Sequence, residues 1–337
     1  MSATGARSPA APDPPAELVA RFVDSLARLW PDGGRLGLAV SGGPDSLALL
    51  LLAEAALPGQ IEVATVDHGL RPESAAECAG VAELCAGRGI ACTVLEVSVA
   101  GGNVQNEARR ARYTALTEWA ERRVLSAVAT AHHADDQAET LVMRLNRGSG
   151  LAGLTGVREA RFLPGSAVAL VRPLLSFRRA ELRALVEAAG LEPVEDPSNV
   201  DDRFDRARVR RALAEADWLD PVALSRSACL LGEAQQAIEA TAEIEWLNGV
   251  SEEGEGYGYC PSAGSRYIET EVVTAIIARM GGTARRSEVA KLVDRLNGGR
   301  PGNLAGVLAQ PVTQDLGDDA GTVQKWIFSP EPPRRLH

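Results

Sequence analysis

Residues 36–50 of the chain read LGLAVSGGPDSLALL, an apolar run, a turn of small residues and a second apolar run. The first run is apolar on both faces, which is typical of a buried strand in a parallel sheet. Residues 47–56 contain no Gly or Pro that would end a helix. Gly42 and Gly43 in the turn can adopt positive φ, so backbone N–H groups can converge on an anion beside the positive end of that helix. The stretch therefore predicts a phosphate-binding loop between a strand and a helix.

The turn differs from the Walker loop, which has a Lys before its last hydroxyl residue, because Asp45 stands in that place. A carboxylate beside phosphates implies an intervening cation, so Asp45 is the predicted Mg²⁺ ligand. This arrangement suits a nucleotide cleaved between its α- and β-phosphates, with the loop holding the departing pyrophosphate. An ordinary strand-to-helix turn is the alternative. The predicted nucleotide-binding residues are Ser41, Gly42, Gly43, Pro44, Asp45 and Ser46.

Strand and helix patterns alternate from this stretch to about residue 150. Four apolar runs, each followed by a helical segment, are the pattern of a parallel sheet with crossover helices. We therefore expect an α/β fold with a doubly wound parallel sheet, in which ligands bind at the carboxyl ends of the strands. The expected strands are residues 36–40, 61–66, 90–97 and 125–131, and the expected helices are residues 46–56, 73–88, 104–122 and 135–145.

The composition is that of a globular chain, with 337 residues of which 45% are hydrophobic and 24% are charged. A chain of this length is expected to form two domains. Its apolar runs are shorter than the ~20 residues of a membrane span, and the N-terminus lacks the order of a signal peptide, so we expect a cytoplasmic protein that binds no membrane. We expect a disordered leader at residues 1–16, a catalytic domain at 17–215, a smaller, mainly helical substrate-binding domain at 216–330 and a tail at 331–337.

The second domain carries weaker signals. It contains no pattern that indicates catalysis. The expected helices are residues 224–247, 270–280 and 287–296, and residues 252–258 are expected to form an acidic, glycine-rich loop.

A second informative stretch, residues 132–140, reads HHADDQAET. Asp136 and Glu139 are three residues apart at the start of a predicted helix, so they share one face and can hold a metal ion or an ammonium group. Alternatively, acidic residues at this end of a helix serve the macrodipole alone. The spacing by itself leaves both interpretations open.

Several of these motifs resemble those of a known family. The SGGPDS turn looks like the PP-loop of the ATP pyrophosphatase superfamily, whose members adenylate a carbonyl oxygen and then displace AMP with a nucleophile. Residues 132–140, together with RGSGL at 147–151, are similar to a signature of tRNA(Ile)-lysidine synthetases. Three further stretches agree in the family's order, VDHGLR at 66–71, EARRARY at 107–113 and RPLL at 172–175, so the match covers roughly residues 35–215.

The resemblance implies an ATP-dependent carbon–nitrogen ligase. Such an enzyme joins L-lysine to the wobble cytidine of the tRNA(Ile) with a CAU anticodon, forming lysidine and changing the specificity of the tRNA from Met to Ile. It implies ATP and Mg²⁺ as cofactors and an adenylated cytidine as intermediate. Asp136 and Glu139 would serve the lysine amine, and Arg112 would steady the phosphate. The predicted catalytic residues are Asp45, Arg112, Asp136 and Glu139.

The formal net charge of −10 argues against a generally basic nucleic-acid binder, so contact with tRNA needs a local patch. Residues 203–211 read RFDRARVRR, with five arginines against one Asp. This run resembles the family's Arg-Asn-x-x-Arg segment, except that Ala207 stands where the family usually has Asn. A solvated helix face is the alternative. The predicted tRNA-binding residues are Arg203, Arg206, Arg208, Arg210 and Arg211.

Two other functions stay open. Another PP-loop tRNA-modifying enzyme, of the 2-thiocytidine type, would share the turn but needs cysteines for sulfur or a cluster. The five cysteines form no C-x-x-C pair, and we interpret them as reduced, mostly buried thiols. A non-catalytic adenine-nucleotide-binding module would keep the turn without needing Asp136, Glu139 or an arginine patch. The sequence leaves the oligomeric state open, including a homodimer.

Overall fold

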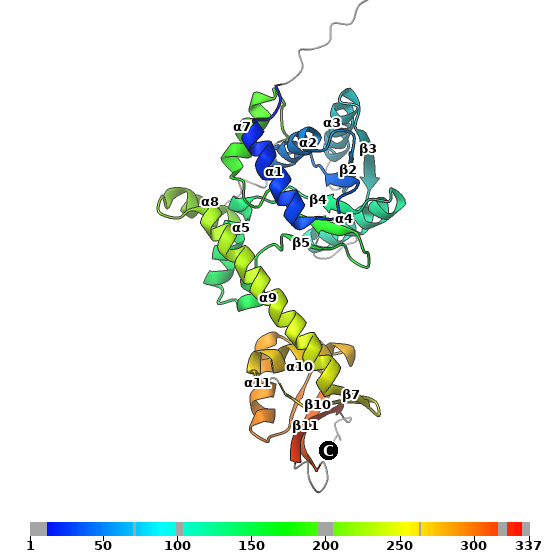
Figure 1. Cartoon of the computed structure of the whole chain (residues 1–337), viewed down its shortest axis with the longest axis vertical. Coiled ribbons are helices and arrows are strands. Elements are labelled where there is room, and N and C mark those ends of the chain that lie inside the picture. The colour runs from blue at the N-terminus through cyan, green and yellow to red at the C-terminus, as the bar shows by residue number, and fades with distance from the viewer. Residues whose placement is uncertain are drawn as a thin grey trace, which may run out of the picture. The chain divides into compact units, whose positions relative to one another are not determined.

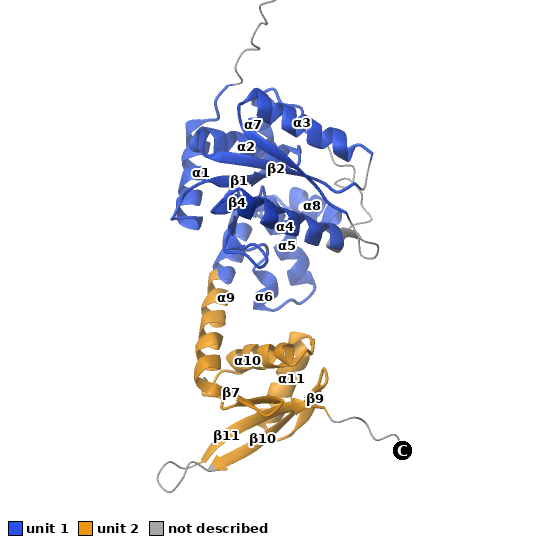
Figure 2. Ribbon diagram, turned by 90° about the vertical axis from the view of Figure 1, so that its right-hand side faces the viewer, with its two compact units in different colours: residues 1–232 blue, residues 233–337 orange. Residues whose placement is uncertain are grey.

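The computed structural model describes residues 12–69, 72–98, 104–194, 205–262, 264–315 and 322–331 (Figure 1). The chain forms two compact units, residues 1–232 and 233–337, and the boundary between them lies within helix α9 (Pro221–Gly249) (Figure 2). Most of the predicted leader and of the predicted tail lies outside the described residues. No helix in the described part of the chain is long and apolar enough to cross a membrane.

The first unit is built on a six-stranded sheet with the strand order β3–β2–β1–β4–β6–β5. Strand β1 lies between β2 and β4, and all pairings are parallel except that of β5 with β6. The predicted doubly wound parallel sheet is therefore confirmed. The strands are β1 (Leu36–Ala39), β2 (Ile61–Asp67), β3 (Ala91–Glu96), β4 (Ala127–Ala129), β5 (Ala160–Phe162) and β6 (Ala169–Val171).

Helices cover both faces of this sheet (Figure 2). Helix α2 is apolar all round and its residues Ser46–Ala53 are buried, as expected for a helix enclosed by the sheet and by other helices. On the opposite face, α4 packs Leu116 and Trp119 against the strands. The helices are α1 (Ala16–Leu29), α2 (Pro44–Ala56), α3 (Ser74–Gly87), α4 (Val104–Arg122), α5 (Ala134–Asn146), α6 (Leu151–Leu154), α7 (Arg179–Ala188) and α8 (Asp205–Glu215).

The sequence did not predict β5 and β6. Each has three residues, which is too short for an alternating pattern to be recognised. They are held by the sheet, because the Ala129 position of β4 pairs with Val171 of β6 and Val171 in turn pairs with Ala160 of β5. This extension brings β5 to the edge of the sheet.

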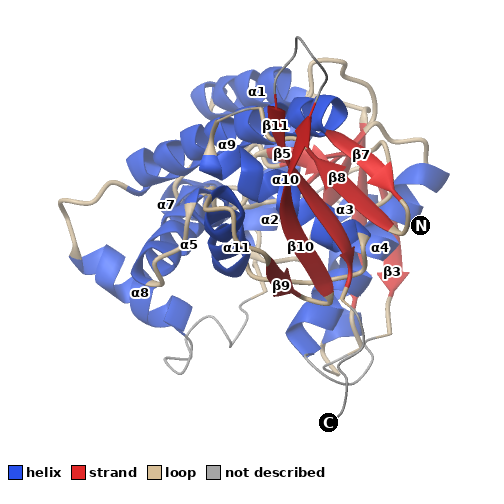
Figure 3. Ribbon diagram, turned by 90° about the horizontal axis from the view of Figure 1, so that it is seen from below, coloured by secondary structure: helices blue, strands red, loops and turns tan. Residues whose placement is uncertain are grey.

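The second unit combines the expected helices with a five-stranded antiparallel sheet of order β7–β8–β11–β10–β9, whose strands are red in Figure 3. Its core contains Ile276, Val293, Trp326 and Phe328. The sequence predicted the helices but not this sheet. The elements are α10 (Arg266–Arg279), α11 (Arg286–Asn297), β7 (Val250–Glu253), β8 (Gly256–Tyr259), β9 (Gly302–Leu304), β10 (Val307–Asp315) and β11 (Thr322–Pro330).

The expected loop at residues 252–258 was wrong, because this segment belongs to the β7–β8 hairpin. Its glycines looked like loop residues, yet they allow β8 to lie close to β11. A Cβ atom on Gly256 would stand 1.9 Å from the Phe328 carbonyl oxygen, so only glycine fits there. The turn itself is at Gly254, which has φ +58°.

Candidate active site

The predicted phosphate-binding loop lies between β1 and the first turn of α2. Gly42 has φ +84°, and Gly43 caps a helix that begins at Pro44, a position where proline is favoured. The Ser46 hydroxyl closes the turn, because it accepts the Ser41 N–H at 3.1 Å and donates to the Gly43 carbonyl at 2.9 Å. The loop is thus shaped by its own side chains, with the positive end of α2 beside it.

A cavity of about 480 Å³ opens at the carboxyl ends of the central strands, next to this loop. Such edges are where open α/β sheets bind ligands. The cavity contains three of the four predicted catalytic residues, whereas Glu139 does not line it. Its polar lining includes Ser41, Asp45, Ser46, His68, Arg112, Thr130, His132 and Asp136.

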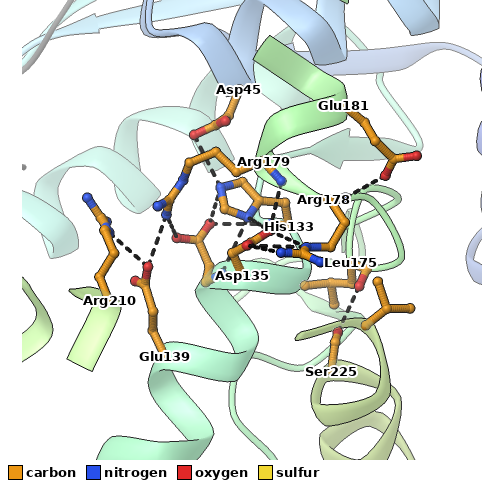
Figure 4. Close-up of polar contacts among 12 residues, drawn as sticks. Asp45, His133, Asp135, Glu139, Leu175, Arg178, Arg179, Glu181, Arg210 and Ser225 are labelled. Carbon is orange, nitrogen blue, oxygen red and sulfur yellow. Dashed lines mark hydrogen bonds and ion pairs between the residues drawn. The ribbon is translucent and has the colours of Figure 1, made fainter. Parts of the chain in front are cut away.

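His133 connects the loop to α5 (Figure 4). Its side chain is fully buried, and its Nε2 atom lies 3.4 Å from one carboxylate oxygen of Asp45 and 3.4 Å from one of Asp136. Its Nδ1 accepts the Asp136 N–H at 3.3 Å as the cap of α5. Burial opposes the charged imidazolium, but the nearby carboxylates of Asp45 and Asp136 outweigh it and raise the pKa of His133. His133 therefore holds the two carboxylates at one place in the cavity wall.

Asp135 ties the start of α5 to the start of α7 (Figure 4). It accepts the Arg179 backbone N–H at 2.7 Å and lies 3.3 Å from the Arg178 guanidinium. Burial favours the neutral form of Asp135, but these hydrogen bonds prevail and lower its pKa. The Asp135 carboxylate therefore has a structural role, because it joins the starts of two helices.

Glu139 lies one helical turn beyond Asp136 and is 1% exposed. Three guanidinium groups surround it, with Arg206 at 2.6 Å, Arg210 at 2.8 Å and Arg179 at 3.1 Å. Burial would raise the pKa of Glu139, but the hydrogen bonds from Arg210 and Arg206 lower it overall. Figure 4 shows Arg210 and Arg179 reaching this carboxylate from different helices.

The predicted tRNA-binding arginines lie on α8, except for Arg203, which is outside the described residues. Arg206 also contacts Asp136, with 2.7 Å between its guanidinium and the carboxylate. Arg208 lies 2.5 Å from Asp205 on the same helix. Arg206 and Arg210 thus point toward α5, whereas Arg208 and Arg211 are on the exposed side of α8.

Two histidines in the cavity wall are held neutral. Burial lowers the pKa of His132 well below its usual range, and the positive charges of Arg172 and Arg112 lower it further. Its Nδ1 lies 3.1 Å from the Thr130 hydroxyl. Burial and Arg112 likewise lower the pKa of His68. At neutral pH these imidazoles add hydrogen-bonding groups to the cavity but no charge.

The sequence analysis assigned no role to three residues that organise the site, His133, Asp135 and Arg179. His133 and Asp135 directly follow a predicted strand, at the sheet edge where ligands bind, and that position was an available signal. Arg179 gave no such signal, because its contact with Glu139 joins residues 40 positions apart.

The sheet, the loop and the cavity define a nucleotide-binding protein of the PP-loop class, and the PP-loop domain family model matches residues 17–217. Among solved structures, the U34-tRNA thiolase NcsA from Methanococcus maripaludis has a TM-score of 0.53 at 17% identity, covering 64% of this chain and 78% of its own. At that identity the likeness concerns the fold alone.

Sequence relatives identify the family more narrowly. The tRNA(Ile)-lysidine synthase of Novosphingobium aromaticivorans is 52% identical over 278 residues, which cover 81% of this chain and 85% of the relative. The tRNA(Ile)-lysidine synthase of Zymomonas mobilis is 37% identical over 90% of this chain and 91% of its own length. The chain therefore belongs to the tRNA(Ile)-lysidine synthase family, which confirms the resemblance seen in its motifs.

Proposed function

We propose that the protein uses ATP to join L-lysine to the wobble cytidine of the tRNA(Ile) with a CAU anticodon. The product is lysidine, and the intermediate is an adenylated cytidine. Membership of the family supports this function. The structural observation that carries it is the single cavity at which the loop serines, Asp45, Arg112 and Asp136 meet.

In the first step, the C2 oxygen of cytidine forms a bond to the α-phosphorus of ATP, and the bond from that phosphorus to pyrophosphate breaks. Residues Ser41–Ser46 and the positive end of α2 hold the departing pyrophosphate. Arg112 lines the same cavity as the loop and stabilises negative charge on the α-phosphate. Bases in an anticodon loop can be presented singly to such a pocket.

We assign Asp45 as the carboxylate that holds Mg²⁺. Asp45 Oδ1 is buried, and among the described residues it has no hydrogen-bond partner, so it is free to accept a cation. No group of three His, Cys, Asp or Glu side chains in the described parts of the chain is arranged to hold a metal ion. Mg²⁺ usually binds one or two carboxylates together with substrate phosphates, so a single carboxylate beside the bound phosphates fits. The ion would neutralise charge on the phosphates.

In the second step, the lysine amine forms a bond to C2 of the cytidine, and the bond from C2 to the adenylate oxygen breaks to release AMP. The amine must lose a proton before it attacks, and we assign Asp136, one of the carboxylates that line the cavity, as the group that accepts it. Glu139 is buried, does not line the cavity and is paired with three arginines. We assign it to positioning Arg179, Arg206 and Arg210 near the bound lysine.

The remaining assignments are proposals of the same kind. Residues 17–215 carry the reaction, and residues 216–330 contribute to binding of the tRNA. Arg208 and Arg211, on the exposed side of α8, contact phosphates of the tRNA, and the same role is proposed for Arg203. The reaction takes place in the cytoplasm, where ATP, lysine and tRNA are available. A homodimer stays a prediction that light scattering of the purified chain can test.

The decisive experiment incubates the protein with labelled lysine, ATP and a transcript of the CAU-anticodon tRNA(Ile). We expect label in the tRNA together with release of AMP and pyrophosphate. Asp45→Ala should abolish pyrophosphate release, because the loop then lacks its cation ligand. Asp136→Asn should impair lysine transfer more than pyrophosphate release, so that adenylated tRNA accumulates.

Asp24→Ala is the matched control, since Asp24 is an exposed carboxylate on α1 far from the loop in sequence. Full activity of a folded Asp45→Ala variant would show that the loop is only structural. Binding of ATP without any turnover would favour the adenine-nucleotide-binding module. In a parallel reaction with a sulfide donor in place of lysine, transfer of sulfur to the tRNA would favour the 2-thiocytidine type.

A further inference from the structure

Four arginines gather around one tyrosine in the first unit, and we call them, with Tyr113, the Tyr113 group. The guanidinium carbons of Arg109, Arg112 and Arg161 lie 5.1, 5.3 and 4.9 Å from the centroid of the Tyr113 ring. The guanidinium of Arg172 lies beside the Tyr113 hydroxyl. Arg109 and Arg112 are on α4, whereas Arg161 is on β5 and Arg172 directly follows β6. The group is therefore assembled by the edge of the sheet and the helix that covers it.

Burial differs strongly within the group. Arg172 is 2% exposed and Tyr113 is 4% exposed, whereas Arg109 and Arg161 are exposed at the surface. Arg172 donates to the Arg158 carbonyl oxygen, but its Nε has no hydrogen-bond partner among the described residues. Burial, with the charges of Arg161 and Arg109, lowers the pKa of Arg172 to about 10 even though Tyr113 acts in the opposite direction. The charged form of the buried Arg172 is thus disfavoured both by burial and by the neighbouring arginines.

The Tyr113 group has no acidic counterpart in the described residues, and in this it differs from most arginines of the same unit. Arg21 pairs with Glu181, Arg88 pairs with Glu54, and Arg123 pairs with Glu62. No ion pair of the described chain involves any of the four arginines around Tyr113. The face of the tyrosine ring compensates a cation only weakly compared with a carboxylate. A concentration of guanidinium groups without carboxylates is suited to an anion supplied from outside the chain.

The position of the group indicates which anion. Arg112 also lines the nucleotide cavity, beside His132 and Asp136. From there the group extends outward to the exposed Arg109 and Arg161. Arginines that lead from the cavity to the surface are suited to the phosphates of a polynucleotide whose reacting base enters the cavity. The phosphates of the nucleotide itself are held by the loop, residues 41–46, which also lines this cavity.

We propose that Arg109 and Arg161, adjoining Arg112 at the nucleotide cavity, form a binding site for the backbone phosphates that flank the reacting nucleotide of the RNA substrate. Arg172 is a positioning residue beneath them, which holds Tyr113 and the outer guanidinium groups in place. This inference rests on the proposed function, since it assumes an RNA whose reacting base enters the cavity. It adds a phosphate site on α4 and β5 to the arginines of α8.

The test measures binding of the CAU-anticodon tRNA(Ile) transcript to full-length Arg161→Glu and Arg109→Glu variants at several salt concentrations. We expect each to bind the transcript about tenfold more weakly at low salt, and to lower the slope of log affinity against log salt by about 0.7 to 0.9 per lost contact. Arg161→Lys should retain much of the affinity, because it keeps the charge. ATP affinity without tRNA should stay at the wild-type value.

Arg122→Glu is the matched control, because Arg122 lies on the same helix as Arg109 but is paired with Glu118. Arg109 and Arg161 are both exposed, so each variant should fold, and circular dichroism checks this. A loss of tRNA affinity no greater than that of Arg122→Glu would overturn the inference. An equal loss of ATP affinity would also overturn it, since the group would then bind phosphates of the nucleotide. Failure of the wild-type protein to incorporate lysine would refute the proposed function instead.

Discussion

Helix α8 and the Tyr113 group both concentrate arginines near the same cavity, but they differ in what surrounds the charges. On α8, Arg206 and Arg210 contact Glu139, and Arg208 contacts Asp205. In the Tyr113 group three guanidinium groups lie around an aromatic ring, and none of the four arginines has a carboxylate partner in the described residues. The first arrangement joins two helices of the protein, and the second leaves positive charge available to a ligand.

The density of arginines along a sequence is therefore a poor guide to which of them bind phosphates. Residues 203–211 carry five arginines in nine positions, yet at least three of them have carboxylates close by. Arg161 and Arg172 are isolated in the sequence and join Arg109 and Arg112 only in space. Replacing Glu139, Arg172 and Arg208 in turn tests this distinction.

Replacing Glu139 should have the largest effect. Glu139→Ala removes a buried carboxylate and leaves three arginines facing one another, and losing one partner of such a cluster is strongly destabilising. We expect the free energy of unfolding to fall by about 3 kcal/mol, measured by chemical denaturation. Lysine incorporation should also fall sharply, because Arg206 and Arg210 lose the contact that positions them. An unchanged stability would contradict the structural pairing of α5 with α8.

The pH dependence of the free energy of unfolding, measured for a second variant, Glu139→Gln, separates the effect of charge from that of packing. The folded-state pKa of Glu139 is lowered, so its contribution to stability is present above the unfolded-state pKa of about 4.3 and is lost as the pH falls through the folded-state pKa. The stability difference between wild type and Glu139→Gln should therefore be constant near neutral pH and shrink below about pH 4. A difference that persists in strong acid would mean that packing, and not charge, accounts for the effect.

Replacing Arg172 should have a smaller effect on stability, although Arg172 is as buried as Glu139. Arg172→Met keeps the side-chain volume and removes a buried cation without a carboxylate, which offsets the lost hydrogen bond to the Arg158 carbonyl. We expect the free energy of unfolding to change by less than about 1.5 kcal/mol. Binding of the tRNA transcript should weaken, because the support beneath Tyr113 is lost. A drop as large as that of Glu139→Ala would show that the Tyr113 group is a structural cluster like that on α8.

Replacing Arg208 should have the smallest effect. Arg208 and Asp205 form an exposed pair, and such pairs contribute little to stability. We therefore expect the thermal midpoint of Arg208→Glu to match that of wild type, and its tRNA affinity to fall less than that of Arg161→Glu. The opposite order of tRNA affinities would favour α8 as the main phosphate-binding surface.

The central fold and its loop could be predicted from the sequence alone. Continuous apolar runs in β1 and β2 and the uninterrupted apolar helix α2 are local patterns, and local patterns can be read from one chain. The same holds for the SGGPDS turn, because backbone geometry around Gly42 and Gly43 depends on the residues present. The ordered motifs of residues 35–215 were sufficient to identify the family, as the relatives confirm.

The partners of each charged side chain became visible only in the folded structure. Glu139 looked like a free site carboxylate in the sequence, and folding encloses it among Arg179, Arg206 and Arg210, which are 40 to 71 residues away. Arg161 looked isolated, and the edge strand β5 brings it to the ring of Tyr113. The short strand β5 is itself held by pairing with β6, which leaves no local pattern. Electrostatic interactions depend on distance and burial in the folded chain, and separation along the sequence specifies neither.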